Sequence, residues 1–172
     1  MDVEEAIRRR RSIRRFRKDE LPDGIAEKLI ELANMAPSAG NLQARDFIVV
    51  RDRKTREALA EAALDQEFVA QAPLNIVVCA NMERIEHYGS RGKTLYTLQD
   101  VAAAVQNILL VAVSEGLGAV WVGAFDEERA RKILGTPEHI RPVAIIPVGY
   151  PDQNPKERPK LPMNELVHYE KW

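Results

Sequence analysis

Residues 95–115 constrain the fold of this chain more than any other segment, because they have the pattern of one long helix that is apolar on most sides. Apolar residues recur there at helical spacing and include Ala102, Val105, Ile108, Leu109, Ala112 and Val113. A helix with so wide an apolar surface must lie inside a core, or face a core on one side and a partner chain on the other. The segment therefore predicts a central helix and favours an oligomer.

Helical and strand patterns alternate along the rest of the chain. Helices are predicted at 3–10 with Asp2 as cap, from about Pro22 or Asp23 up to Pro37, at 54–64, and up to 134 behind the cap Asp126. Strands are predicted at 47–50, 75–80, 119–125 and 143–149. No internal repeat or long linker divides these elements, so we expect residues 1–172 to form a single domain.

The final segment, residues 150–172, differs from the rest in composition. It is rich in proline and charge, yet it ends with the apolar residues Leu166, Val167, Tyr169 and Trp172. Such a segment is typical of an extended arm that docks on another surface.

Positive charge is concentrated in Arg8–Lys18, where eight of eleven side chains are cationic although the formal net charge of the chain is -1. A helix C-terminus accounts for Arg8 and Arg9, since cations are favourable there. It does not account for Ser12 and Arg14, whose hydroxyl and guanidinium donors suit a phosphate. A nucleic-acid-binding module is an outside alternative. It is disfavoured because the segment lacks interleaved aromatic residues and because 26 Asp and Glu residues offset the 25 Lys and Arg residues.

Several familiar functional motifs are missing from the sequence. Cys79 is the only cysteine and cannot pair within the chain, so a reducing cytoplasm is the expected compartment. Three scattered histidines give neither metal-ligand spacing nor a Ser/His/Asp pattern, so we expect no metal. The glycines of GLGAVWVG follow a helix rather than a strand, which indicates a helix C-cap and not a dinucleotide fingerprint. No apolar run approaches the roughly 20 residues of a membrane span, so we expect no membrane insertion.

Two polar features remain to be explained. Asp100 lies in the apolar helix, where an uncompensated charge is costly, so a buried arginine or backbone partner is expected and a structural role is favoured over a catalytic one. The stretch APSAGNLQ, residues 36–43, follows a helix and is most simply an ordinary turn. Its amide side chains are equally suited to bind the polar edge of a ring.

Taken in order, these stretches resemble the FMN-dependent nitroreductase family, in particular its short, single-domain NAD(P)H oxidoreductases. The resemblance covers essentially the whole chain and rests on R-x-S-x-R at 10–14, P-S-x-x-N-x-Q at 37–43, the helix around Asp100, WVGAF at 121–125 and the ending from Val148. It implies an α+β, three-layer fold with a mixed, mainly antiparallel sheet flanked by helices. It also implies a homodimer with two FMN sites at the interface, and a C-terminal arm exchanged with the partner subunit.

The resemblance also implies which positions bind the cofactor. Contacts with the FMN phosphate, ribityl chain and pyrimidine edge are expected from Arg10, Arg11, Ser12 and Arg14. The other subunit is expected to supply the ring-facing loop with Pro37, Ser38, Ala39, Asn41 and Gln43. Backbone near flavin N5 is expected from Trp121, Val122, Gly123 and Ala124. Further phosphate contacts are expected among Lys156, Arg158 and Lys160, of which we favour Arg158 and Lys160.

One departure from the family concerns the pyrimidine end of the flavin. Larger members place a lysine there, whereas this chain has Phe68 at about that position, and Gln66 offers a hydrogen bond but no charge. A cation near N1 and O2 stabilises the anionic reduced flavin. Either Arg14 carries that role alone or the flavin has a lower potential.

The activity that the resemblance implies is hydride transfer from NADH or NADPH through flavin N5 to a small organic acceptor, of nitroaromatic or quinone type, by a ping-pong mechanism. No catalytic side chain is expected, since the flavin carries the chemistry. The segment between Asn81 and Thr97 is expected to be a mobile cover over the ring. A non-turnover FMN-binding or storage protein, and another flavin activity on the same fold, are the alternatives.

Overall fold

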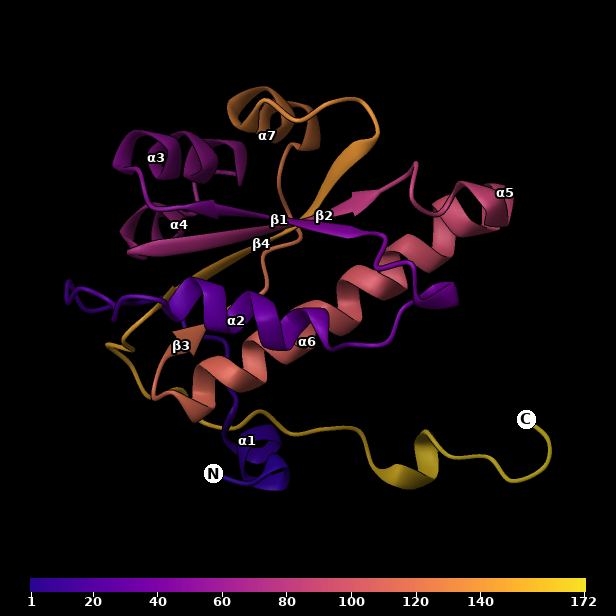
Figure 1. The fold of residues 1–172 in the computed structure, drawn as a ribbon. Helices are drawn as coiled ribbons and strands as arrows, with labels where there is room; N and C mark the ends of the chain where they lie inside the picture. The colour runs from indigo at the N-terminus through magenta and orange to yellow at the C-terminus, as the bar shows by residue number, and fades with distance from the viewer.

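The structure, a computed structural model, describes residues 1–172 and has three layers, with a sheet between two groups of helices (Figure 1). The sheet has the order β1-β2-β4-β3. Its strands are β1 (Arg45–Val50), β2 (Leu74–Asn81), β3 (Gly118–Ala119) and β4 (Ile140–Gly149), and every pairing between them is antiparallel. An isolated parallel bridge joins Ser12 to Ala119 beside β3. The expected α+β architecture with a mainly antiparallel sheet is confirmed.

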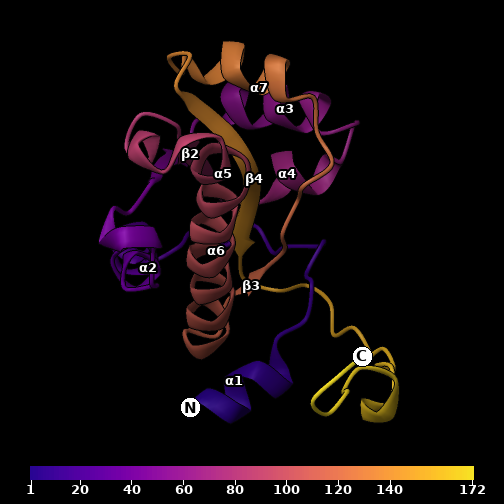
Figure 2. The same cartoon turned by 90° about the vertical axis from the view of Figure 1, so that its right-hand side faces the viewer.

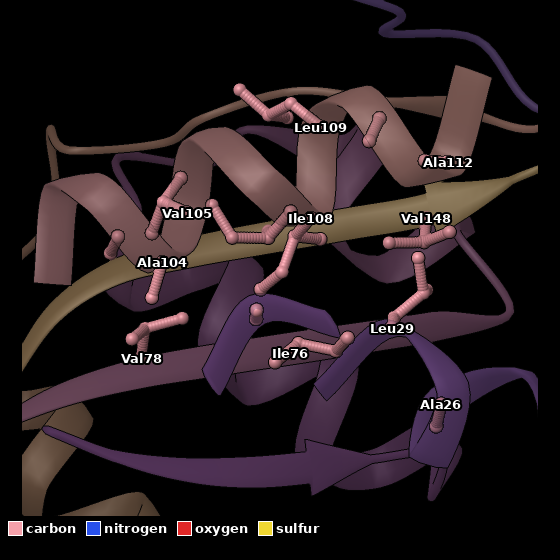
Figure 3. Close-up of a cluster of buried hydrophobic side chains, with 14 of the residues drawn as sticks. Ala26, Leu29, Ile76, Val78, Ala104, Val105, Ile108, Leu109, Ala112 and Val148 are labelled. Atoms are coloured by element: carbon pink, nitrogen blue, oxygen red, sulfur yellow. The ribbon is translucent and has the colours of Figure 1, made fainter. Parts of the chain in front are cut away.

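One face of the sheet is covered by α2 (Ile25–Asn34) and α6 (Thr97–Ser114), and the larger core lies between them and the strands (Figure 3). Side chains alternate along β2, so that Ile76 and Val78 enter this core. From α6, the core takes the fully buried residues Val101, Ala104, Val105, Ile108 and Ala112. The prediction of a central helix is therefore confirmed.

The opposite face of the sheet carries α3 (Arg53–Ala62), the short α4 (Glu67–Gln71) and α7 (Glu127–Leu134). Val77 and Cys79, the alternate residues of β2, point into this second core. The N-terminal helix α1 (Val3–Arg9) packs near the C-terminal end of α6 (Figure 2). The predicted caps are confirmed, because the carboxylates of Asp2 and Asp126 accept hydrogen bonds from the first turns of α1 and α7.

The helical run Glu86–Ser114 is long and apolar enough, by length and composition alone, to cross a membrane. The expectation that no segment reaches that length was therefore wrong. In the fold this run belongs to the core, since its apolar positions in α6 pack against the sheet and α2. The cytoplasmic location stays a prediction.

Two predicted segments have a different structure. The strand expected at 119–125 is reduced to the two residues of β3 and an isolated bridge between Val122 and Ile145, with one further contact from the backbone N of Val120 to the carbonyl of Pro147 at 3.4 Å. The segment between Asn81 and Thr97, expected to be a mobile cover, is mostly helical, with the turns Glu86–Tyr88, Gly89–Arg91 and Gly92–Tyr96 leading directly into α6. Its mobility stays a prediction. Buried Ile85 and Gly92 anchor these turns to the body of the protein.

Residues 150–172 form an extended arm with one short helical turn, Met163–Glu165, at the far end (Figure 2). Its apolar side chains are exposed within this chain; they are Leu161, Met163, Leu166, Val167, Tyr169 and Trp172. The arm therefore has the predicted shape, and its exchange with a partner subunit stays a prediction.

Candidate functional site

The basic segment and the arm together line a pocket of about 390 Å³, which we call the basic pocket. The segment after α1 contributes Arg8, Arg10, Arg11, Ser12 and Arg14, together with Ile7. The arm contributes Pro155, Lys156, Glu157, Arg158 and Lys160. Two predicted groups of phosphate contacts, more than 130 residues apart in the chain, thus lie around one cavity.

Backbone pairing explains why the arm returns to the basic segment. Ile13 donates from its backbone N to the carbonyl of Ala119 at 3.1 Å, and Phe16 forms a bridge with Pro151 at the start of the arm. Ile13 and Phe16 are buried, whereas Ser12 and Arg14 are not. The polar side chains of this segment are therefore left for the pocket.

Two glycines allow this close approach. A Cβ atom on Gly118 would come within 2.7 Å of the Ile13 side chain, and one on Gly149 within 2.9 Å of Phe16. Neither contact is sterically possible without movement of the basic segment. The glycines of β3 and β4 thus fix how near the segment lies to the sheet.

The charge of the basic pocket is strongly positive. Seven of its side chains are Arg or Lys and one, Glu157, is acidic. Glu157 lies 3.1 Å from a guanidinium nitrogen of Arg11, which is the only ion pair between lining residues. Arg10, Arg14, Lys156, Arg158 and Lys160 form no ion pair. Forked guanidinium donors beside a serine hydroxyl are the donor set that binds a phosphate group.

A second group of predicted residues adjoins the basic pocket through Arg14. The guanidinium carbon of Arg14 lies 6.0 Å from the ring centroid of Phe68, at the outer limit of a cation–π contact. Gln66, two residues earlier, donates from Nε2 to the carbonyl of Ala124 at 3.0 Å. The structure therefore brings Arg14, Gln66 and the 121–124 segment onto one side of the molecule, with Trp121 partly exposed there.

Residues 36–43, which we call the Ser38 loop, form a compact turn held by its own polar side chains. Ser38 Oγ accepts a hydrogen bond from the backbone N of Gln43 at 3.0 Å, and Gln43 Nε2 donates to the side-chain oxygen of Asn41 at 2.6 Å. Asn41 and Gln43 both have positive φ, 56° and 45°. The loop is thus a defined turn, and its contact with a flavin ring stays a prediction.

The Ser38 loop and residues of the basic pocket adjoin opposite ends of α6. Asp100, in the first turn of α6, contacts the loop, whereas Val113 near its last turn adjoins Arg8 and Arg11. At 1.5 Å per residue these two positions on α6 are about 20 Å apart. One chain therefore does not bring its own Ser38 loop to its own basic pocket.

Asp100 has the buried partners that the sequence predicted. Its Oδ1 accepts a hydrogen bond from the backbone N of Ala39 at 3.0 Å, and the buried Arg45 donates from Nη1 to the backbone carbonyl of Asp100 at 3.2 Å. Burial lowers the pKa of Arg45, and the negative charge of Asp100 opposes that shift. Sequence reasoning did not find Arg45. The available signal was an arginine opening the apolar strand RDFIVV, which indicates a buried charge with a specific partner.

The other chemistry-bearing side chains lie apart from one another. Burial raises the pKa of the Cys79 thiol to about 12, so that it is protonated and unreactive at neutral pH. His139 contacts Glu83 at 3.4 Å, and His168 stacks on Trp172 within the arm. No group of three or more His, Cys, Asp or Glu residues is placed to hold a metal ion.

Comparisons with known proteins agree on one family. The family model described as the nitroreductase family matches residues 7–68 and 62–150. A protein of Methanothermobacter thermautotrophicus, whose provisional name joins NADH dehydrogenase and NAD(P)H nitroreductase, is 40% identical over 100% of this chain and 88% of its own length. The NADH dehydrogenase of Thermus thermophilus is 35% identical over 97% of this chain and 95% of its own.

A solved structure shows the same likeness. The NADPH:FMN oxidoreductase of Vibrio harveyi, in complex with NAD+, superimposes with a TM-score of 0.90 and 31% sequence identity. The match covers 98% of this chain and 76% of that one. The similarity therefore extends over the whole fold, including the basic segment and the Ser38 loop.

Proposed function

The chain belongs to the nitroreductase family, and on that premise we propose that it is an NAD(P)H-dependent oxidoreductase that binds FMN. The observation that carries the proposal is the basic pocket, which gathers Ser12 and seven cationic side chains from two distant segments. Its donors fit one terminal phosphate group of high negative charge. Similarity to an NADPH:FMN oxidoreductase supports FMN as the source of that phosphate.

Within the site, Arg10, Arg11 and Ser12 hold the phosphate and the ribityl chain. Arg158 and Lys160 approach the phosphate from the arm, while Lys156 lines the same pocket. Arg11 is already paired with Glu157, so its charge is partly neutralised before an anion arrives. Arg10 and Arg158, which have no carboxylate partner, are therefore the stronger phosphate ligands.

Arg14, Gln66 and residues 121–124 would hold the flavin ring beside the phosphate-binding residues. Arg14 lines the basic pocket and approaches the Phe68 ring, which supports a contact between its cation and the pyrimidine edge. The Gln66 amide holds the Ala124 carbonyl and so fixes the backbone of the 121–124 segment. Gly123 leaves that backbone uncovered, because a Cβ atom there would meet only the Trp121 ring nitrogen at 3.9 Å.

The opposite side of the ring is supplied by a second copy of the chain. Within one chain the Ser38 loop lies about 20 Å along α6 from the basic pocket, so a complete site needs the loop of a partner. The protein is accordingly a homodimer with two sites at the interface. The exposed apolar side chains of the arm give it a surface to bury on that partner.

When bound, FMN would supply hydride transfer between NADH or NADPH and a second substrate, with the two substrates using one place in turn. The protein orients both substrates, excludes water and places the charge of Arg14, and no side chain has to move a proton as a general base. A small nitroaromatic or quinone is the class of acceptor that fits this role.

The colour of the purified protein tests the proposal. We expect a yellow protein that releases FMN on denaturation and is bleached anaerobically by NADH or NADPH. Colour that returns on adding a quinone or nitroaromatic supports the oxidoreductase. Bound FMN that neither nucleotide bleaches indicates a storage protein, and a colourless protein that FMN does not reconstitute contradicts the proposal.

A further inference from the structure

A buried pair of opposite charges lies directly beneath the Ser38 loop. Arg45 is 2% exposed and Asp100 is 4% exposed, and neither belongs to the basic pocket. Together they bind the backbone at the start of the loop. Arg45 donates to the carbonyls of Ala36 and Pro37, and Asp100 accepts from the backbone N of Ala39. Their role is therefore tied to the shape of the loop.

Arg45 binds four backbone carbonyl groups. Its Nη2 donates to the carbonyls of Asn34 at 2.9 Å and Ala36 at 2.7 Å. Its Nη1 donates to the carbonyls of Pro37 and Asp100, both at 3.2 Å. The last turn of α2 contains no basic residue of its own, so Arg45 supplies the cation at that helix end. Only a planar, forked guanidinium reaches this set of acceptors.

Asp100 fixes the next peptide of the loop. Its Oδ1 accepts from the backbone N of Ala39, two residues after the carbonyl of Pro37 that Arg45 holds. The other end of the loop is fixed by Arg84, whose Nη1 donates to the carbonyl of Gln43 at 2.6 Å. The positive φ angles of Asn41 and Gln43 are thus held between two anchored ends.

Stability alone does not explain two opposite charges buried at this place, where Arg45 binds the backbone carbonyl of Asp100 and Asp100 Oδ2 has no hydrogen-bond partner. Replacing such a pair with well-packed apolar residues is often neutral or stabilising, because two charges must be removed from water to form it. α2 and α6 already share an apolar interface through Leu29, Val105 and Ile108. What Arg45 and Asp100 add is a fixed orientation for peptides 36–39.

We propose that Arg45 and Asp100 are positioning residues that set the flavin-facing geometry of the Ser38 loop, and that they act on the site of the partner subunit. The proposal rests on the proposed function, since it requires the loop to face FMN. It assigns no contact with FMN to either residue. Their effect passes through the backbone of residues 36–39.

Homodimeric variants give the first test, with FMN binding and the visible spectrum of bound flavin as readouts. Arg45→Lys keeps the charge but loses the fork, and we expect FMN affinity to fall about tenfold, the cost of one buried hydrogen bond. Asp100→Asn keeps an oxygen for Ala39 and should bind FMN better than Asp100→Ala. Asn107→Ala is the matched control, because Asn107 on α6 donates to the Leu32 carbonyl of α2 away from the loop.

A change in thermal stability alone does not test the positioning role, so FMN affinity and the flavin spectrum must be measured beside it. If Arg45→Lys and Asn107→Ala lower the melting temperature equally and leave FMN affinity and spectrum unchanged, the pair serves only to join the helices and the proposal fails. Altered affinity and spectrum with Arg45→Lys, but not with Asn107→Ala, support it.

Mixed dimers test whether the effect acts on the partner's site. Pairing an Arg14→Ala chain with an Arg45→Lys chain should leave one intact site, because both lesions fall on the other site. Pairing Asn41→Ala with Arg45→Lys should leave none. If the first mixture has no intact site, Arg45 acts on its own chain and the proposal is wrong. Should Arg45→Lys not assemble, Asp100→Ala replaces it with the same expected outcomes.

A reference mixture separates this result from the proposed function. Arg14→Ala paired with Asn41→Ala should leave one intact site without any change at Arg45. If that reference fails, the site is not shared between chains, and the claim that Arg45 acts on the partner's site falls with it. If the reference holds and the Arg45 mixture fails, only the positioning role is overturned.

Discussion

The guanidinium of Arg14 lies 6.0 Å from the centre of the Phe68 ring, at the edge of the basic pocket. Phe68 occupies about the position where larger nitroreductases are expected to have a lysine. Arg14 is thus the cation nearest the proposed pyrimidine edge. Because Arg14 lies beside Phe68, its effect on the flavin can be measured separately from the effect of the cations that are proposed to bind the phosphate.

Arg14→Gln should lower the reduction potential of bound FMN. A cation near N1 favours the reduced, anionic flavin, and each ~1.4 kcal/mol of that preference corresponds to ~30 mV in a two-electron couple. Redox titration at saturating FMN measures the shift. We expect a shift of tens of millivolts, roughly one to two such steps.

Arg158→Gln is the matched control for Arg14→Gln, since it removes one cation from the same pocket. A phosphate contact stabilises oxidised and reduced FMN almost equally, so this variant should weaken FMN binding and leave the potential nearly unchanged. Equal and negligible potential shifts in both variants would show that Arg14 is only another phosphate or ribityl ligand.

Gly118→Ala should destabilise the protein and weaken FMN binding together. The new Cβ would lie 2.7 Å from the Ile13 side chain, so the basic segment must move away from β3. Overpacking of this kind costs about 1–3 kcal/mol. Thermal unfolding without FMN and FMN titration measure the two effects.

Gly123→Ala provides the contrast with Gly118→Ala. Its Cβ would meet nothing closer than 3.9 Å, so the unfolding temperature without FMN should not change, whereas the backbone next to the flavin gains a methyl group. A loss of stability as large as that of Gly118→Ala would show that steric fit at β3 is not what positions the basic segment.

Cys79 should make the folded protein less stable at alkaline pH. Burial raises the pKa of its thiol from 9.0 to about 12, so between these values the unfolded chain has lost this proton while the folded chain retains it. The contribution of Cys79 is complete below pH 9 and is lost as the pH rises toward 12. Denaturant unfolding from pH 8 upward should show a shallower decline for Cys79→Ala, and identical pH profiles would contradict the raised pKa.

Much of the fold follows from local sequence signals. The apolar periodicity of α6, the caps Asp2 and Asp126, and the apolar runs of β2 and β4 each specify an element through its own residues. The strand predicted at 119–125 is shorter in the structure, because beyond β3 only Val120 and Val122 form backbone hydrogen bonds with β4 and the pairing ends at Val122.

The site was harder to predict from local signals, because it depends on contacts between distant residues. The meeting of Arg14 with Arg158 and Lys160 was implied by family resemblance and not by any spacing. The anchor of the Ser38 loop, Arg45, was missed because a single arginine at a strand start does not reveal the four carbonyl groups that it binds.

One helix of the fold was also missed. The five residues of α4 are too few for a helical period to be recognised in the sequence.

The central claim is that FMN is held by the basic pocket of one chain and the Ser38 loop of another. The most direct measurement counts FMN per dimer in a purified mixed dimer of Arg14→Ala and Asn41→Ala chains, each homodimer having been shown to bind FMN poorly. Both lesions then fall on one site, so the account predicts one tightly bound FMN per mixed dimer. A mixed dimer with two equally weakened sites and no tightly bound FMN would contradict it.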